Sequence, residues 1–229
     1  MEENNTQAWW IPRNFARKRI FLEQRGRLMV AIRAYFVSEG FLEVETPALQ
    51  LSPGLEPHLM AFSTDLEGHN GGDARRMYLH TSPEFTMKKL LVAGTENIFQ
   101  MARCYRNRER SSTHHPEFTM LEWYRKDISY TKIMDDTEAL LKVCMHALPE
   151  RKLFAWNGLS SDVNIPWQRI SVQDAFQKYA GIDLLATAPH AEKPEAKLLA
   201  HEAERIGIST RADDSWEDIF FRIFLERIE

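Results

Sequence analysis

The stretch CYRNRERSSTHHPEFTMLEWY, residues 104–124, predicts two β-strands joined by a polar, charged loop, with Arg106 at the end of the first strand. Past the loop the residues alternate between two rows, as a pleated strand requires. The rows are Phe118, Met120, Glu122 and Tyr124 on one face and Glu117, Thr119, Leu121 and Trp123 on the other. A carboxylate and a phenol beside an aromatic ring are unusual on a plain core face. Together with Arg106 they suit a nucleotide phosphate, a flat base and an ammonium group.

Length and composition limit the class of protein. With 229 residues and 44% apolar residues, the chain can bury one substantial core, as a single large domain or a domain with an appendage. A net charge of −4 argues against a strongly electrostatic nucleic-acid binder. Cys104 and Cys144 have no paired spacing, which indicates a reducing compartment without a disulfide framework. No apolar run reaches the roughly 18 residues of a membrane span, and no signal-peptide core is evident, so we expect a cytoplasmic protein with no membrane partner.

Local patterns predict mixed helices and strands. Apolar residues recur at helical spacing from Leu28, and Gly40 is placed to end that helix. Residues 41–46 alternate like a strand, which Pro47 stops. Further strands are expected at residues 57–66, 77–80, 97–105 and 117–125, and further helices at 83–94, 130–148, 171–180, 189–207 and 214–229. Residues 153–170 read as irregular or short-stranded.

Residues 13–27 form a basic segment, in which a single acid, Glu23, stands among Arg13, Arg17, Lys18, Arg19, Arg25 and Arg27. Such a run is more often the solvated face of a helix than a patch for a partner. We expect the solvated face, and a partner-binding patch is the alternative.

The hairpin at residues 97–125 resembles motif 2 of the class II aminoacyl-tRNA synthetases, in the version carried by lysyl-tRNA synthetases and their relatives. The helix, short strand and proline that end at Pro47 resemble motif 1, which builds the dimer interface in that family. The resemblance implies an α+β fold, with an antiparallel sheet flanked by helices, and a homodimer through residues 25–47. The chain contains neither G-x-G-x-x-G nor a Walker A sequence, so a Rossmann or P-loop nucleotide site is not expected.

The resemblance also implies a role for each matching residue, with ATP and Mg²⁺ as cofactors. Arg106 matches the catalytic arginine that holds the α-phosphate, and the alternative is a structural arginine paired with an acid. The expected ATP-binding set is Arg106, Asn107, Arg108, Glu109, His114, His115 and Phe118, with adenine on Phe118. The expected substrate set is Ser82, Pro83, Glu84, Glu122 and Tyr124, whose oxygens would receive amino groups. Glu84 could instead be an ordinary helix N-terminal acid. No residue shows metal-ligand spacing, so none is assigned to a metal.

Parts of the family pattern are replaced or missing. Arg108 stands where the motif usually has an acid, with Glu109 one residue later, and His115 replaces a loop asparagine. The loop arginine is absent, with Ser111, Ser112 and Thr113 in that region. No candidate for motif 3, a glycine-rich strand and helix, is found, so we expect a C-terminally incomplete core. The expected organisation is a basic arm at residues 1–24, a catalytic core at 25–150 and a helical insertion or remaining core at 151–229.

About 25 residues precede motif 1, too few for an anticodon-binding OB domain, so tRNA is not the expected partner. The tracts at residues 81–94 and 117–125 are most similar to the tRNA-independent branch that modifies elongation factor P. The resemblance therefore implies ATP-dependent activation of lysine or (R)-β-lysine as an aminoacyl-adenylate, with elongation factor P as the acceptor. The alternatives are a lysyl-tRNA synthetase-like enzyme and a non-catalytic dimerising or nucleotide-binding paralogue.

Overall fold

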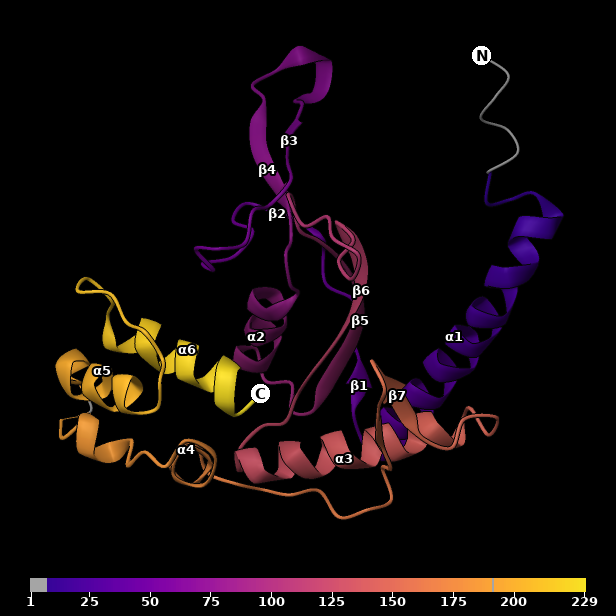
Figure 1. Cartoon of the computed structure of the whole chain (residues 1–229). Coiled ribbons are helices and arrows are strands. Elements are labelled where there is room, and N and C mark those ends of the chain that lie inside the picture. The colour runs from indigo at the N-terminus through magenta and orange to yellow at the C-terminus, as the bar shows by residue number, and fades with distance from the viewer. Residues whose placement is uncertain (1–7, 191) are drawn as a thin grey trace. The chain divides into compact units, whose positions relative to one another are not determined.

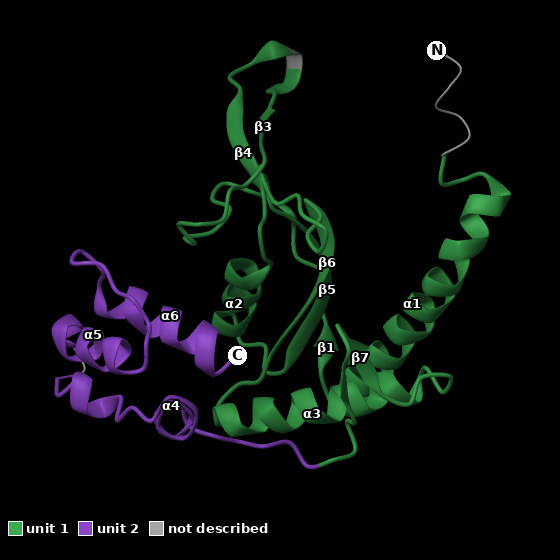
Figure 2. Ribbon diagram, viewed as in Figure 1, with its two compact units in different colours: residues 1–165 green, residues 166–229 purple. Residues whose placement is uncertain are grey.

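The computed structural model describes residues 8–190 and 192–229 (Figure 1). The chain divides into two compact units, residues 1–165 and 166–229 (Figure 2). The boundary expected at residues 24/25 falls inside one continuous helix, α1 (Pro12–Ser38), and the one expected at 150/151 lies ahead of the division between the units. The basic segment is therefore part of the same helix as the first motif.

The helices of unit 1 are α1, α2 (Glu84–Val92) and α3 (Tyr130–His146), with a 3-10 turn at His69–Gly71. Its strands are β1 (Leu42–Glu43), β2 (Leu49–Gln50), β3 (Ser63–Leu66), β4 (Arg75–Leu79), β5 (Ile98–Tyr105), β6 (Glu117–Tyr124), β7 (Phe154–Trp156) and β8 (Leu159–Ser161). The predicted hairpin and the helix predicted at residues 130–148 are confirmed within a residue or two. The strand predicted at residues 57–66 is confirmed in its last four residues.

The main sheet has the order β1-β5-β6. Strands β5 and β6 pair antiparallel, with Ile98 opposite Tyr124 and Tyr105 opposite Glu117. Strand β1 pairs parallel with β5, so the expectation of an antiparallel sheet is wrong at this position. The physical reason is the long connection between them, which holds β2–β4 and α2 and returns the chain in the original direction. Strands β2, β4 and β3 form a second, antiparallel sheet.

One face of the hairpin is buried against α1 and α3. Phe36 of α1 stacks on Phe99 of β5 with 4.7 Å between ring centroids, and Phe41 and Trp123 pack around it at 5.0 and 5.5 Å. Leu140 of α3 completes this core. Stacked and edge-to-face rings at these separations stabilise a core beyond their buried area. The row that contains Trp123 is therefore the core row, and the opposite row is left for other contacts.

A buried ion pair holds the end of β6 against α3. Arg125 donates to both carboxylate oxygens of Asp136, at 2.6 and 2.9 Å, and its guanidinium lies 4.3 Å from the ring centre of Phe41. Lys132 is 3.3 Å from the same carboxylate, which is fully buried. Burial opposes ionisation of Asp136, but hydrogen bonds and charge from Arg125 and then Lys132 outweigh it, so the pKa of Asp136 is lowered. This ion pair fixes the position of Arg125, which directly follows Tyr124 at the end of β6.

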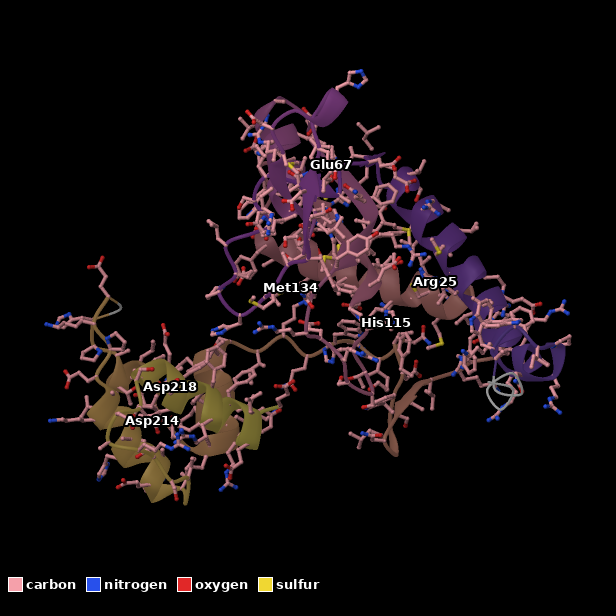
Figure 3. All side chains as sticks on the ribbon, turned by 90° about the horizontal axis from the view of Figure 1, so that it is seen from above. Arg25, Glu67, His115, Met134, Asp214 and Asp218 are labelled. Atoms are coloured by element: carbon pink, nitrogen blue, oxygen red, sulfur yellow. The ribbon has the colours of Figure 1, made fainter. Side chains whose placement is uncertain are left out.

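The basic segment occupies the first half of α1, which extends past the sheet (Figure 1). Its six basic residues are all exposed, and the solvated face and the partner-binding patch both stay predictions. Three also contact the rest of unit 1 or their own helix: Arg19 pairs with Glu23, Arg25 (Figure 3) donates to Thr119, and Arg27 pairs with Glu150. In the described ranges, none of the helices combines the length and apolar character needed to cross a bilayer.

Unit 2 is a small helical body with its own core. Its helices are α4 (Val172–Ala180), α5 (Ala196–Arg205) and α6 (Trp216–Arg227), with a 3-10 turn at Leu185–Thr187. The buried core residues are Phe176, Ile182, Leu184, Leu199, Ala203, Ile208, Ile219 and Ile223. Ser215 and Asp218 form a capping box at the start of α6, and Asp214 pairs with Arg222 at 2.7 Å (Figure 3). All three helices predicted for residues 171–229 are confirmed, although α5 begins seven residues later than expected.

We expect Asp136→Asn to lower the free energy of unfolding at pH 7 by about 3 kcal/mol, because the buried guanidinium of Arg125 loses its counter-charge. The pKa of Asp136 is lower in the folded than in the unfolded chain. The contribution of Asp136 to the free energy of unfolding is therefore complete above its pKa in the unfolded chain, which is near about 4. It is lost as the pH falls through the pKa of Asp136 in the folded chain. Urea unfolding at pH 7 and pH 3 should show the difference between parent and variant shrinking at the lower pH.

The matched control is Asp127→Asn, because Asp127 is 88% exposed and asparagine tolerates its φ of 53°. The control should change stability by less than about 0.5 kcal/mol. Equal stability of parent and Asp136→Asn at pH 7 would contradict a structural role for the pair.

Candidate functional site

The second face of the hairpin carries the polar row. Phe118, Met120, Glu122 and Tyr124 of β6 lie opposite Cys104, Ala102, Gln100 and Ile98 of β5, respectively. Directly opposite residues of an antiparallel pair share a face. The turn at Ser82, just before α2, approaches this face, because the Ser82 hydroxyl donates to Glu122 at 2.9 Å. The face therefore combines side chains from the hairpin and from the start of α2.

Glu122 is held by hydroxyl groups on both of its oxygens. Ser82 donates to Oε2 at 2.9 Å, and Tyr124 donates to Oε1. Burial raises the pKa of Tyr124 well above its usual range, and the hydrogen bond to Glu122 and the charges of Glu122 and Glu84 raise it further. The phenol therefore stays protonated and acts as a donor. The Glu122 carboxylate is therefore oriented by two hydroxyl donors.

Glu84 begins α2 beside this group. Its backbone N–H donates to the Ser82 hydroxyl at 3.1 Å, and its carboxylate pairs with Lys88 one turn later. Pro83 is fully buried immediately before the helix, where its fixed φ suits the first turn. Glu84 is thus a first-turn acid of α2 and also lies close enough to Tyr124 to raise its pKa. Glu84 is thus a helix N-terminal acid, and its role in substrate binding stays a prediction.

Arg106 and Phe118 meet at the loop end of the hairpin. The guanidinium of Arg106 lies 5.1 Å from the ring centre of Phe118, and its Nε donates to the Thr81 carbonyl at 3.4 Å. Glu109 is 3.9 Å from the guanidinium, at the limit of an ion pair. Arg106 is about one quarter exposed, so its charge is accessible from one side. A partly exposed guanidinium over an aromatic ring can receive a phosphate next to a flat base.

The expected loop residues divide into two groups. Asn107 and Glu109 are half-buried beside Arg106, and the Asn107 backbone N–H donates to the Met60 carbonyl at 2.6 Å. Arg108, with φ of 69°, is exposed. The two histidines are exposed and bond within the loop: His114 lies 2.9 Å from the Ser111 hydroxyl, and His115 lies 2.9 Å from the Glu117 carbonyl (Figure 3). Asn107 and Glu109 therefore lie beside Arg106. Arg108, His114 and His115 lie in the exposed part of the loop.

A pocket of about 200 Å³ lies next to Arg106 and the start of α2. Arg106, Ser82, Glu84, Thr81, Phe85 and Met120 line one side, and the segment Pro53, Gly54, Leu55, Glu56 and Leu59 lines the other. Gly54 has φ of 152°, and a β-carbon there would lie 3.2 Å from the Thr81 hydroxyl oxygen. Sequence reasoning assigned no role to this segment. The Pro-Gly dipeptide at residues 53–54 is the signal that marked a special turn.

A buried thiol lies beneath the same face. Burial raises the pKa of Cys104 to about 11, the charge of Glu122 adds to this effect, and Arg106 opposes it. The thiol is therefore protonated at neutral pH and is a packing group rather than a nucleophile. Within the ranges that the structure describes, no three His, Cys, Asp or Glu side chains are grouped so that they could hold a metal ion.

Arg106 and Glu84 line the pocket at the start of α2, and Phe118 and Glu122 contact its lining residues Arg106 and Ser82. The chain belongs to the family of class II tRNA synthetases described as D, K and N, whose model matches residues 4–221. It is 34% identical over 208 residues to the elongation factor P–(R)-β-lysine ligase of Haemophilus ducreyi, covering 91% of this chain and 56% of that protein.

Two further relatives extend the comparison. The elongation factor P–(R)-β-lysine ligase of Vibrio vulnificus is 42% identical over 139 residues, which cover 61% of this chain and 42% of that protein. The lysine–tRNA ligase of Pelotomaculum thermopropionicum is 36% identical over 213 residues, which cover 93% of this chain and 40% of that protein. The chain spans about half the length of the curated relatives it matches.

Proposed function

We propose that this chain carries the nucleotide- and amine-binding face of a ligase that activates lysine or (R)-β-lysine with ATP and transfers it to a lysine of elongation factor P. The observation that carries the proposal is the Glu122 carboxylate, held by Ser82 and Tyr124 on the hairpin face that also bears Phe118. The names of relatives at 34–36% identity supply the acceptor and the amino acid.

The proposed reaction has two steps. The substrate carboxylate attacks the α-phosphorus of ATP, the bond to the bridging oxygen of the β-phosphate breaks, and pyrophosphate leaves. An acceptor amine then attacks the carbonyl carbon of the adenylate, and AMP leaves as the new amide forms. Both steps depend on holding the reactants in line and on neutralising charge at phosphorus.

Arg106 is the proposed catalytic group, because its guanidinium matches the geometry of phosphate oxygens. Adenine would replace the guanidinium on the face of Phe118 as Arg106 turns toward the α-phosphate. Asn107, Glu109 and the more exposed Arg108, His114 and His115 complete the proposed nucleotide set. Mg²⁺, when bound with ATP, would offset phosphate charge, and the nucleotide's own oxygens supply ligands for it.

Glu84 and Glu122 are the proposed acceptors for the amino groups of the substrate, with Tyr124 and Ser82 orienting Glu122. Two carboxylates close to one phenol are costly to desolvate unless a cation binds between them. Lysine and (R)-β-lysine each carry two ammonium groups, and this charge supports either of them over an uncharged amino acid. Pro83 contributes by fixing the start of α2.

A second candidate function is the charging of tRNA with lysine. The relative from Pelotomaculum thermopropionicum carries that name at 36% identity, so sequence similarity alone does not separate the two acceptors. The net charge of −4 favours a protein acceptor over a polyanion. A non-catalytic, nucleotide-binding paralogue is the third candidate.

We also propose a homodimer through residues 25–47. Val30, Val37 and Leu42 are 69%, 61% and 58% exposed in this segment, which is high for aliphatic side chains on one helix and strand. A cavity of about 740 Å³ lies beside them, lined by Arg33, residues 43–48, His80 and residues 100–103. Burial of this surface in a second copy would remove the exposed apolar area from water.

The first prediction concerns activation. We expect ATP–pyrophosphate exchange that is stimulated by lysine or (R)-β-lysine, and Arg106→Ala should reduce it by about 10²- to 10³-fold because the charge at phosphorus is no longer offset. The matched control is Arg75→Ala, which removes an exposed arginine from β4, outside both the pocket beside Arg106 and the cavity at the proposed interface. Exchange retained in Arg106→Ala would exclude the catalytic role, and no exchange from a folded parent would favour the non-catalytic candidate.

The second prediction concerns the acceptor. Radiolabelled (R)-β-lysine should appear on elongation factor P and not on tRNA when both are offered with ATP. A variant of elongation factor P with its acceptor lysine replaced by arginine is the control, because its guanidinium is not nucleophilic at neutral pH. Label on tRNA instead would support the second candidate function.

The third prediction concerns assembly. Light scattering should give the mass of a dimer, and Val37→Asp should shift it toward the monomer by placing a charge in the proposed interface. Val92→Asp is the control, since Val92 is 90% exposed on α2, outside residues 25–47. A monomeric parent at micromolar concentration would contradict the dimer.

A further inference from the structure

One of the two site carboxylates is already paired with a cation of the chain itself. Lys88 forms an ion pair with Glu84 across one turn of α2. Glu122, in contrast, accepts hydrogen bonds from the neutral hydroxyls of Ser82 and Tyr124. The two carboxylates thus have different partners in this structure, although both act on Tyr124.

We propose that Lys88 is an internal competitor for the substrate's ammonium group and thereby lowers the affinity of the site for diamino acids. In this structure its ammonium neutralises Glu84. A substrate ammonium that binds Glu84 displaces Lys88 into solvent. This inference rests on the proposed function and adds a residue that controls how tightly the site binds its substrate.

The position of Lys88 allows this exchange. Its side chain is 53% exposed and that of Glu84 is 40% exposed, so the pair is near water and contributes little to stability. The lysine stem has four rotatable carbons and can turn outward. Its neighbour Met87 is fully buried and anchors α2 independently. Release of Lys88 therefore leaves the helix and the core in place.

The charges show which substrates compete with Lys88. Glu84, Glu122 and Lys88 together carry a net charge of −1 while Lys88 is in place. A substrate with one ammonium group can bind Glu122 and leave the Lys88 pair intact. A substrate with two ammonium groups can bind both carboxylates, and its second ammonium group takes the place of the Lys88 ammonium at Glu84. The diamine gains the binding free energy of its contact with Glu84, less that of the Glu84–Lys88 contact which it breaks. Removal of Lys88 should therefore increase the affinity for the diamine.

The test is binding of lysine, measured by isothermal titration calorimetry on the 229-residue chain. Lys88→Met and Lys88→Gln should each bind lysine about two- to fivefold more tightly than the parent, the range expected for removal of a partly exposed ion pair. Lys88→Arg keeps the cation and should retain the parental affinity. ATP affinity should be the same in all of them, because Lys88 does not line the pocket beside Arg106.

The matched control is Lys142→Met. Lys142 pairs with Glu138 at 2.7 Å across one turn of α3, so the same chemical change is made at a distance from the site. Its affinity for lysine should equal that of the parent. Circular dichroism establishes that each variant is folded.

Three outcomes are decisive. Higher affinity for lysine in Lys88→Met and Lys88→Gln, but not in Lys88→Arg or Lys142→Met, supports the role of Lys88 as a competitor. If the parent binds lysine and Lys88→Met binds it with equal or lower affinity, this inference is overturned and the proposed function is not. Failure of every folded protein in the series to bind lysine overturns the proposed function, and this inference with it.

Discussion

The pairing of β5 with β6 is the constraint on which the rest of unit 1 depends. It spans eight residue pairs, from Ile98 opposite Tyr124 to Tyr105 opposite Glu117. Side chains alternate with a period of two, so a slip by one residue would turn the polar row into the core and the core row into the site. The buried pair between Arg125 and Asp136 holds the hairpin at its open end, where such a slip would begin.

The two faces of this hairpin have complementary roles. Aromatic packing around Phe36 and Phe99 makes the rear face rigid, and the front face can then hold Glu122 in one orientation between two hydroxyl groups. A carboxylate on a mobile strand would lose the geometry that a bound ammonium requires. The stability of the aromatic core is therefore a condition for the chemistry proposed on the opposite face.

Several features of the fold and site could be predicted from local sequence. The hairpin, α3 and the helices of unit 2 follow from periodicity and end signals, and the family resemblance is supported by the match over residues 4–221. The proximity of Glu122 and Tyr124 follows from their spacing on one strand. The Glu84–Lys88 pair also has a local signal, a spacing of four residues on a helix, which sequence reasoning did not use.

The sequence by itself thus determined which residues share a strand face or a helix turn, because those relations depend on repeats of two and of about 3.6 residues. Only the tertiary structure decided that β1 runs parallel to β5, that Arg125 meets Asp136, and that Gly54 lines the same pocket as Arg106. These contacts join segments through connections of arbitrary length, and no local period encodes them. They form because burying the aromatic face of one hairpin leaves few arrangements in which the remaining polar groups find partners.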